Sequence, residues 1–144
     1  MIKLIVVGKI KENYLKDAIV DYLKRINKYH KLEIIEVEDS SASEEKNRIL
    51  KHIKPNDYVI TLDIEGNTLS SKELSEKIDK IFISSPSVTF IIGGSDGLDK
   101  EIKNKAAFSL SFSKLTFPHG LFRLILLEQI YRSFKIINNE TYHK

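Results

Sequence analysis

The sequence predicts an α/β protein with an open, largely parallel sheet and helices on both of its faces. Strand-like and helix-like segments alternate along the chain, which is the pattern of successive β-α-β units. The strand-like segments are short and mostly apolar, as expected for strands covered on both faces. The connections between segments are short, so we expect a single domain over residues 1–144.

The first two expected strands flank a helix. We place the strands at Ile2–Val7 and Leu32–Val37. Between them, apolar residues recur at the helical period over residues 15–26, with Asn13 as a candidate cap. Basic residues in this part of the chain either face RNA or form an ordinary solvated surface: Lys9, Lys11, Lys16, Lys24, Arg25 and Lys28.

A short charged helix is expected next. Ser41 and Glu44 have the spacing of a capping box, in which the serine caps the helix and the glutamate bonds back to it. Lys54 and Pro55 provide a stop signal, because the residue before a proline is disfavoured in a helix. We therefore expect this helix to end at Ile53.

The third strand-helix unit follows the same logic. We expect a strand at Asp57–Ile64 and a turn at residues 65–67, where Gly66 and Asn67 are typical turn residues. Ser70 and Glu73 repeat the capping-box spacing and predict the start of the next helix. Its buried stripe is expected to contain Leu74, Ile78, Ile81 and Phe82.

The last part of the chain contains two more strands and a long apolar helix. The strands are expected at Ser87–Ile92 and Phe108–Phe112, with a short helix within residues 98–107. The second of these strands leads into a loop at residues 113–120. Apolar and polar residues then recur at spacings of three and four over residues 121–132, which predicts a helix with a buried face.

Composition narrows the classes of protein. Cysteine is absent, which excludes disulfides and thiolate chemistry and suits a reducing, cytoplasmic location. The apolar run Leu4–Val7 is too short for a signal peptide or a membrane span. With 23 Lys and Arg against 20 Asp and Glu, the net charge is +3, so a nucleic acid would have to meet a local patch rather than a global polycation.

Ligands of open α/β sheets collect beyond the carboxyl ends of the strands, and three loops at such ends stand out. They are residues 62–67, 93–97 and 113–120. Gly93 and Gly94 either leave the backbone bare for a flat ligand or serve a tight turn that needs positive φ. We expect a neutral, backbone-lined pocket beside the basic side chains of the last loop and helix, Lys114, His119 and Arg123.

Several familiar sites are disfavoured. The sequence GGSDG has neither the spacing of the dinucleotide fingerprint nor that of the phosphate-binding P-loop. A flavodoxin-like nucleotide binder would need a phosphate cradle after the first strand, which residues 8–11 do not supply. The histidines have no paired ligand spacing, so we expect no metal, and a GxSxG nucleophile elbow is missing.

Several motifs in order carry a resemblance to a known family. They are IKLIVVGKIKE, VITLDIEG, FIIGGSDGL, LSFSKLTFPHGLFRLILLEQIYRSFKI and a terminal YHK. In this combination the chain resembles, over its whole length, the small SPOUT-class methyltransferases that methylate N3 of a pseudouridine in large-subunit (23S) ribosomal RNA. The resemblance implies S-adenosylmethionine as methyl donor, a C-terminal trefoil knot and a homodimer.

The resemblance also assigns cofactor-binding residues to the three loops picked out above. They are Leu62, Gly93, Phe112, Ser113, Lys114, Leu115, Thr116 and Phe117. The pattern analysis and the resemblance thus point to the same strand ends.

For catalysis, the acceptor N3 must lose a proton, and either His119 or His143 is a candidate to accept it. Arg123 would stabilise an anionic base or hold a phosphate. Tyr142, His143 and Lys144 form a tail that either frays or closes the site of a dimer partner, with Tyr142 stacking on a base.

The modest charge further predicts that the enzyme recognises RNA as shaped by the assembled ribosome. The alternative is a non-enzymatic RNA- or ribosome-binding module on the same fold, which would not bind the cofactor.

Overall fold

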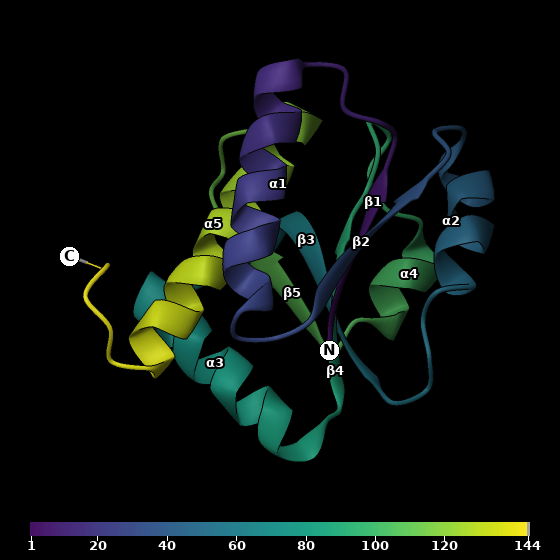
Figure 1. Ribbon diagram of the computed structural model, residues 1–144. Coiled ribbons are helices and arrows are strands. Elements are labelled where there is room, and N and C mark those ends of the chain that lie inside the picture. The colour runs from purple at the N-terminus through teal and green to yellow at the C-terminus, as the bar shows by residue number, and fades with distance from the viewer. Residues whose placement is uncertain (144) are drawn as a thin grey trace.

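The computed structural model describes residues 1–143, which contain a five-stranded sheet of order β2-β1-β4-β3-β5 (Figure 1). Every neighbouring pair of strands is parallel, so the predicted parallel sheet is confirmed. The strands are β1 (Ile2–Val7), β2 (Leu32–Val37), β3 (Asp57–Thr68), β4 (Ser87–Ile92) and β5 (Phe108–Ser111).

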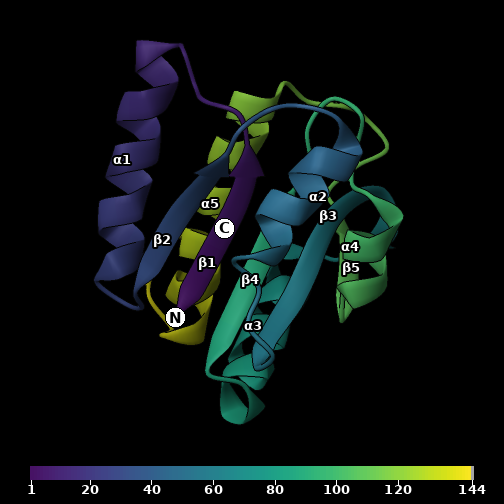
Figure 2. The same cartoon turned by 90° about the vertical axis from the view of Figure 1, so that its right-hand side faces the viewer.

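Helices cover both faces of the sheet, as the sequence predicted (Figures 1 and 2). The helices are α1 (Asn13–Asn27), α2 (Ala42–Leu50), α3 (Ser71–Ser84), α4 (Lys100–Lys105) and α5 (His119–Ile137). One face carries α1, α3 and α5, whose buried residues form the larger core. The other face carries the shorter α2 and α4, which pack on a smaller core.

Successive side chains of the central strands enter the two cores in turn, which explains why these strands are mostly apolar. In β4, Phe90 and Ile92 belong to the larger core, whereas Ile91 between them belongs to the smaller one. Leu4 and Ile5 of β1 divide in the same way. Successive side chains of a strand point to opposite faces, so a sheet covered on both faces favours apolar residues on both, with Lys3 and Thr89 as buried polar exceptions.

The strand order places three strand ends together. A flavodoxin-like sheet has the order 2-1-3-4-5, whereas here β4 lies between β1 and β3. As a result β3 has β4 on one side and β5 on the other. Thr61 of β3 pairs with Ile91 and Leu62 pairs with Leu110, so the middle of β3 lies beside the ends of β4 and β5, where their loops leave the sheet.

The third strand differs from its prediction. The expected turn at residues 65–67 is wrong, because β3 continues to Thr68 with an irregularity between Leu62 and Asn67. Gly66 permits this path, since a Cβ there would lie 2.8 Å from the backbone of Ser109 in β5. A close approach of two backbones is a common use of glycine within a strand.

The helix caps agree with the sequence in two of the three places where we expected them. Ser70 and Glu73 form the full capping box at the start of α3. At the start of α2, Ser41 accepts a bond from the Glu44 backbone N–H, but the second half of the predicted box is missing and Glu44 pairs with Arg48 instead. The cap assigned to Asn13 is wrong, since Asn13 is the first helical residue and the residue before it makes no side-chain cap bond.

The ends of several helices and strands also differ from their predicted positions. Helix α2 ends at Leu50 rather than Ile53, because its last residues turn before the loop that leads to β3. Helix α4 is shorter than the predicted 98–107, and β5 ends one residue before Phe112. Helix α5 begins at His119, two residues earlier than predicted, because the chain turns helical directly after Pro118.

Candidate functional site

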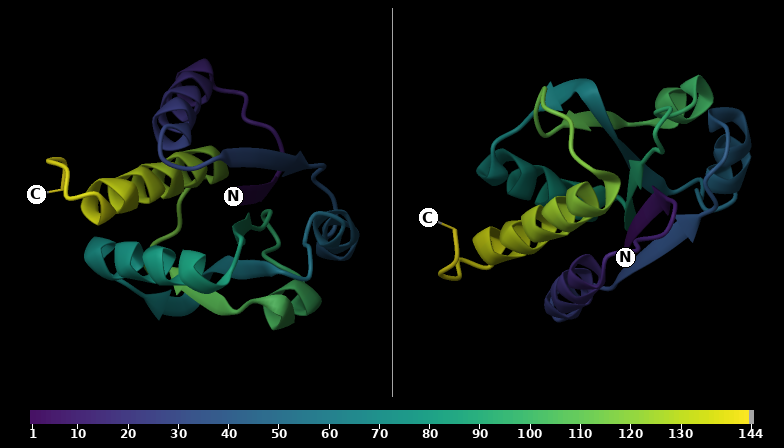
Figure 3. Two further views of the ribbon diagram at one scale, coloured as in Figure 1. Left: turned by 60° about the horizontal axis from the view of Figure 1, so that its bottom comes forward. Right: turned by 90° about the horizontal axis from the view of Figure 1, so that it is seen from above.

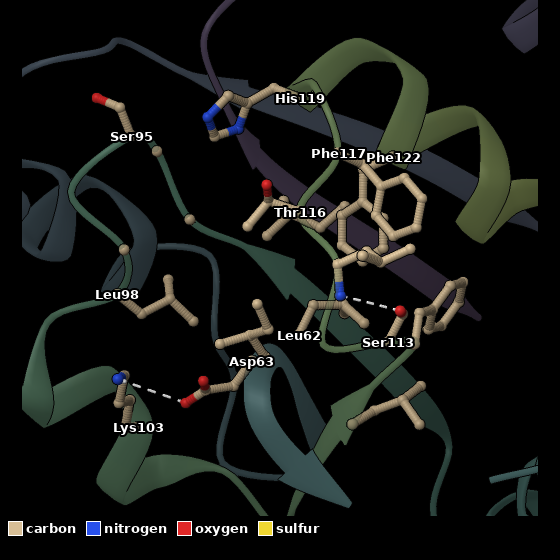
Figure 4. Close-up of a pocket in the computed structure, with 18 residues that line it drawn as sticks. Leu62, Asp63, Ser95, Leu98, Lys103, Ser113, Thr116, Phe117, His119 and Phe122 are labelled. Carbon is tan, nitrogen blue, oxygen red and sulfur yellow. Dashed lines mark hydrogen bonds and ion pairs between the residues drawn. The ribbon is translucent and has the colours of Figure 1, made fainter. Parts of the chain in front are cut away.

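A cavity of about 420 Å³ lies where the irregular part of β3 that begins at Leu62 meets the loops after β4 and β5 (Figure 4). Its size is typical of small-molecule sites. Aliphatic and aromatic side chains make up much of its lining, among them Ile92, Leu98, Leu110 and Phe122. Polar side chains are few, which suits a flat ligand held mainly by shape.

The predicted cofactor residues converge on this cavity. It is lined by Leu62, Gly93, Phe112, Ser113, Leu115, Thr116 and Phe117. Lys114 is exposed and lies outside the lining, because the loop turns its side chain away. The structure therefore brings together all of the predicted set except Lys114.

The loop after β5 is held in shape by serine hydroxyls and aromatic packing. Ser113 Oγ accepts a bond from the Leu115 backbone N–H (3.0 Å), and Ser111 Oγ donates to Ile64 O (3.0 Å). The ring of Phe117 stacks on Phe122 of α5, with centroids 5.7 Å apart. The loop is thereby fixed to both β3 and α5 in a shape that forms one wall of the cavity.

The glycine loop after β4 forms another wall, and its glycines have separate roles. A Cβ on Gly93 would lie 2.9 Å from the carbonyl carbon of Gly97, so Gly93 allows the loop to fold back on itself. Gly97, with φ of +77°, is the residue that needs the left-handed region. Of the two alternatives for this loop, the tight turn is present, but Gly97 rather than Gly93 or Gly94 supplies its positive φ.

A buried carboxylate supports the glycine loop from behind. Glu45 of α2 is only 2% exposed, and a Cβ on Gly94 would lie 3.1 Å from its carboxylate oxygens. Its Oε2 accepts a bond from the Ser40 backbone N–H (2.9 Å). Burial raises the pKa of the Glu45 carboxyl, against the opposing effect of that bond. Sequence reasoning missed Glu45, because a glutamate in a charged helix looks solvated.

Two charged lining residues were also missed. Asp63 follows Leu62 within β3, and Lys103 lies on α4. Their side chains form an ion pair of 3.4 Å. The position of Asp63 directly after a predicted cofactor residue was an available signal, whereas nothing in the sequence around Lys103 distinguished it from the other lysines of α4.

The two basic candidates at the start of α5 have different surroundings. His119 is exposed and lines the cavity, so it is accessible to a ligand there. Arg123 lies one turn further on and points into the protein, with its side chain 4% exposed. It donates to Glu36 Oε2 (2.7 Å) and to Gly8 O (3.3 Å), which ties α5 to β2 and to the end of β1.

The C-terminal tail folds back on its own helix. Tyr142 donates to Glu128 Oε1 (3.2 Å), and its ring packs edge-on against Tyr131. His143 Nδ1 accepts a bond from Arg132 (3.0 Å), and Arg132 is in turn paired with Glu128. Lys144 lies outside the described residues. Tyr142 and His143 are therefore held on α5 through a small set of polar and aromatic contacts.

The tail lies away from the cavity of its own chain. His119 is the first residue of α5, whereas the tail leaves from the last turn of this 19-residue helix and packs on its second half (Figures 1 and 3). At 1.5 Å per residue the helix is roughly 28 Å long. Tyr142 and His143 therefore belong to a different region of the protomer from the cofactor residues.

Within residues 1–143, His, Cys, Asp and Glu side chains form no group of three or more that could bind a metal ion. In the same part of the chain, no helix has the length and apolar character needed to cross a membrane.

A family model described as a predicted SPOUT methyltransferase matches residues 1–143. The chain belongs to this family. Its sequence is 53% identical to the ribosomal RNA large subunit methyltransferase H of Acetivibrio thermocellus, with 99% of each chain covered. It is 49% identical to the protein of the same name from Carboxydothermus hydrogenoformans, again over 99% of each chain.

The fold agrees with the family. A probable methylase family protein from Haemophilus influenzae superposes with a TM-score of 0.60 over 99% of this chain and 70% of its own, at 13% identity. For a SPOUT methyltransferase the methyl donor is S-adenosylmethionine, and a trefoil knot is implied for the segment after β5.

Proposed function

We propose that this SPOUT methyltransferase transfers a methyl group from S-adenosylmethionine to N3 of a pseudouridine in large-subunit ribosomal RNA. The cavity carries this proposal, because the loops assigned to the cofactor from sequence form its walls. The full-length identity to enzymes named ribosomal RNA large subunit methyltransferase H supports the substrate class. A cytoplasmic location fits a ribosomal substrate.

The cavity suits the cofactor chemically. A nucleoside needs apolar walls for its base and a few polar groups for orientation. Leu62, Phe112 and Phe117 supply the walls, while the hydroxyls of Ser113 and Thr116 supply polar groups. When bound, the cofactor provides an electrophilic methyl group on a sulfonium. The protein's contribution is to position the acceptor and to exclude competing water.

Proton removal from the acceptor is the step that a side chain has to perform. His119 lines the cavity and would accept the N3 proton from within the same protomer. His143 is the rival, but it lies on the tail, away from its own cavity. Arg123 is turned inward, so we assign to it the positioning of α5 rather than contact with the RNA.

The position of the tail argues for a homodimer. If Tyr142 and His143 take part in the reaction, they have to reach the cavity of a second protomer, because α5 separates them from their own. In a two-fold dimer both cavities would be completed in the same way. Tyr142 would then stack on a base of the RNA, as the sequence suggested.

The net charge of +3 bears on the form of the substrate. Few phosphate contacts are available per protomer, so we expect recognition of RNA in the shape that the assembled ribosome gives it. Methylation of ribosomes but not of a bare RNA hairpin is the expected result. Comparable rates on the two substrates would contradict it.

Calorimetric titration of S-adenosylmethionine tests the cofactor site. Thr116→Trp fills the cavity and should abolish the saturable binding seen for the wild type. Asn104→Trp adds the same ring at an exposed position on α4 outside the lining and should bind normally. Gly93→Leu is a poor probe, because its side chain would disrupt the loop rather than fill the cavity.

Absence of binding by the folded wild type would contradict the proposal. It would favour a non-enzymatic RNA-binding module.

A further inference from the structure

One side of the cavity carries a pair of opposite charges. Lys103 Nζ lies 3.4 Å from Asp63 Oδ2, and both residues belong to the lining. Figure 4 shows this pair at one side, Phe117 and Phe122 at the opposite side, and Ser95 and His119 at a third. Together with His119, the pair supplies the ionisable side chains of a lining that is otherwise uncharged.

The two charges differ in how firmly they are held. Asp63 Oδ1 accepts a bond from the Glu65 backbone N–H (3.1 Å), which fixes the carboxylate and leaves Oδ2 directed toward Lys103. The Asp63 side chain is 20% exposed, whereas Lys103 is 45% exposed at the end of a long, flexible stem. Asp63 is therefore a fixed negative group, and Lys103 is a positive group that can move to meet a ligand.

A ligand that carries both charges close together matches this pair. The proposed methyl donor ends in an α-amino acid, in which an ammonium and a carboxylate are attached to one carbon. Its adenosine, in contrast, is uncharged, and the flat adenine base suits the aromatic side of the cavity. The charged and apolar sides of the cavity thus correspond to the two ends of the cofactor.

We propose that Asp63 and Lys103 bind the α-amino acid end of the cofactor, with Asp63 accepting from the ammonium and Lys103 donating to the carboxylate. This inference rests on the proposed function and adds two residues that set the orientation of the cofactor. Binding of this kind distinguishes the complete cofactor from plain nucleosides, which would fill the aromatic side alone.

A purely structural role for the pair makes a different prediction. The ion pair also connects α4 to the end of β3, and a partly exposed pair of this kind contributes little to stability. If this connection were its only role, replacing either residue would weaken all ligands of the cavity alike, or none of them.

Calorimetry of the full-length protein with two ligands separates the roles. S-adenosylhomocysteine carries the amino acid, and 5′-methylthioadenosine has the same adenosine and thioether without it. The test variants are Asp63→Asn, whose amide oxygen keeps the bond from Glu65, and Lys103→Met. Matched controls are Glu65→Gln and Lys105→Met, which make the same changes in charge at exposed positions outside the lining.

We expect Asp63→Asn to weaken the binding of S-adenosylhomocysteine about tenfold, as for the loss of a charge-assisted bond at a partly buried site. Lys103→Met should weaken it about threefold, because the more exposed lysine is better screened. Neither variant should change the affinity for 5′-methylthioadenosine. The control variants should bind both ligands as the wild type does.

A third ligand separates the two charges. S-adenosyl-3-thiopropylamine lacks the carboxylate and keeps the ammonium, so its affinity should depend on Asp63 and not on Lys103. Equal weakening of all ligands, or unchanged affinity for S-adenosylhomocysteine, would overturn the assignment. If the wild type bound none of these ligands, the proposed cofactor site itself would be refuted and this inference with it.

Discussion

The two ends of α5 are built in different ways. At its first residue, His119 borders an apolar cavity whose loops are held by a few serine bonds and stacked rings. In its second half, Glu128 and Arg132 are paired with each other and bind the tail through Tyr142 and His143. The first end leaves space for a ligand, whereas the second fixes its side chains in place.

The difference indicates a division of work between binding and chemistry. Groups that enclose a cofactor need an open, shaped space, while groups that act on a substrate need fixed directions. If the tail takes part in the reaction as proposed, the two kinds of group lie at opposite ends of α5. A second protomer is the simplest way to bring them together.

The largest expected effect comes from disabling the cavity in one copy of the chain and the tail in the other copy. Thr116→Trp should block the cavity. If His143 of the partner protomer, rather than His119, accepts the proton, His143→Ala should remove that group, and each variant alone should lose at least about 100-fold in methylation of ribosomes. Mixing equal amounts and allowing the subunits to exchange should restore about a quarter of wild-type activity. Half of the dimers would then be mixed, and each would hold one intact site.

The controls for this experiment use the same mixture. His143→Ala should bind S-adenosylmethionine with wild-type affinity, since the tail lies away from its own cavity. No recovery after exchange, with mixed dimers demonstrated by mass, would contradict a tail acting on the partner. Full activity of His143→Ala would instead leave His119 as the proton acceptor.

An intermediate effect is expected at Arg123. It lies near the cavity end of α5, but its side chain is held by polar contacts, as Tyr142 and His143 are at the other end. Arg123→Met removes the bonds to Glu36 and to Gly8 O, so the free energy of unfolding in urea should fall by about 2 kcal/mol. Arg25→Met removes an exposed pair with Asp21 and should change little. Unchanged stability with lost methyl transfer would make Arg123 a catalytic residue, as the sequence first suggested.

The smallest effect concerns Glu45 behind the glycine loop. Because burial raises the pKa of this carboxyl in the folded state, the unfolded chain ionises first as pH rises, and stability is lost until the folded pKa is passed. Glu45→Gln has no carboxyl to ionise, so it does not lose this stability. Its Tm should equal that of the wild type near pH 4 and exceed it by about 3 °C at pH 7.

Glu76→Gln, an exposed substitution on α3, should show no such trend. The same difference in Tm between Glu45→Gln and the wild type at every pH would contradict a cost from the buried Glu45 charge.

The sequence predicted much of the candidate site because the signals are local. Gly93 directly after an apolar run, and the loop with Lys114, Thr116 and Pro118 after Phe112, marked the strand ends from neighbouring residues alone. The resemblance then placed the cofactor at those same loops. Lys114 was included with its neighbours, because a run of adjacent residues does not show which side chains turn inward.

By itself the sequence determined the order of helices and strands and the covering of the sheet on both faces. These follow from periodicity and from caps such as Ser70, which act over a few residues. The strand order, the inward turn of Arg123, the burial of Glu45 and the Asp63–Lys103 pair were decided by the tertiary structure. Each depends on contacts between segments far apart in the chain, which periodicity and caps do not show.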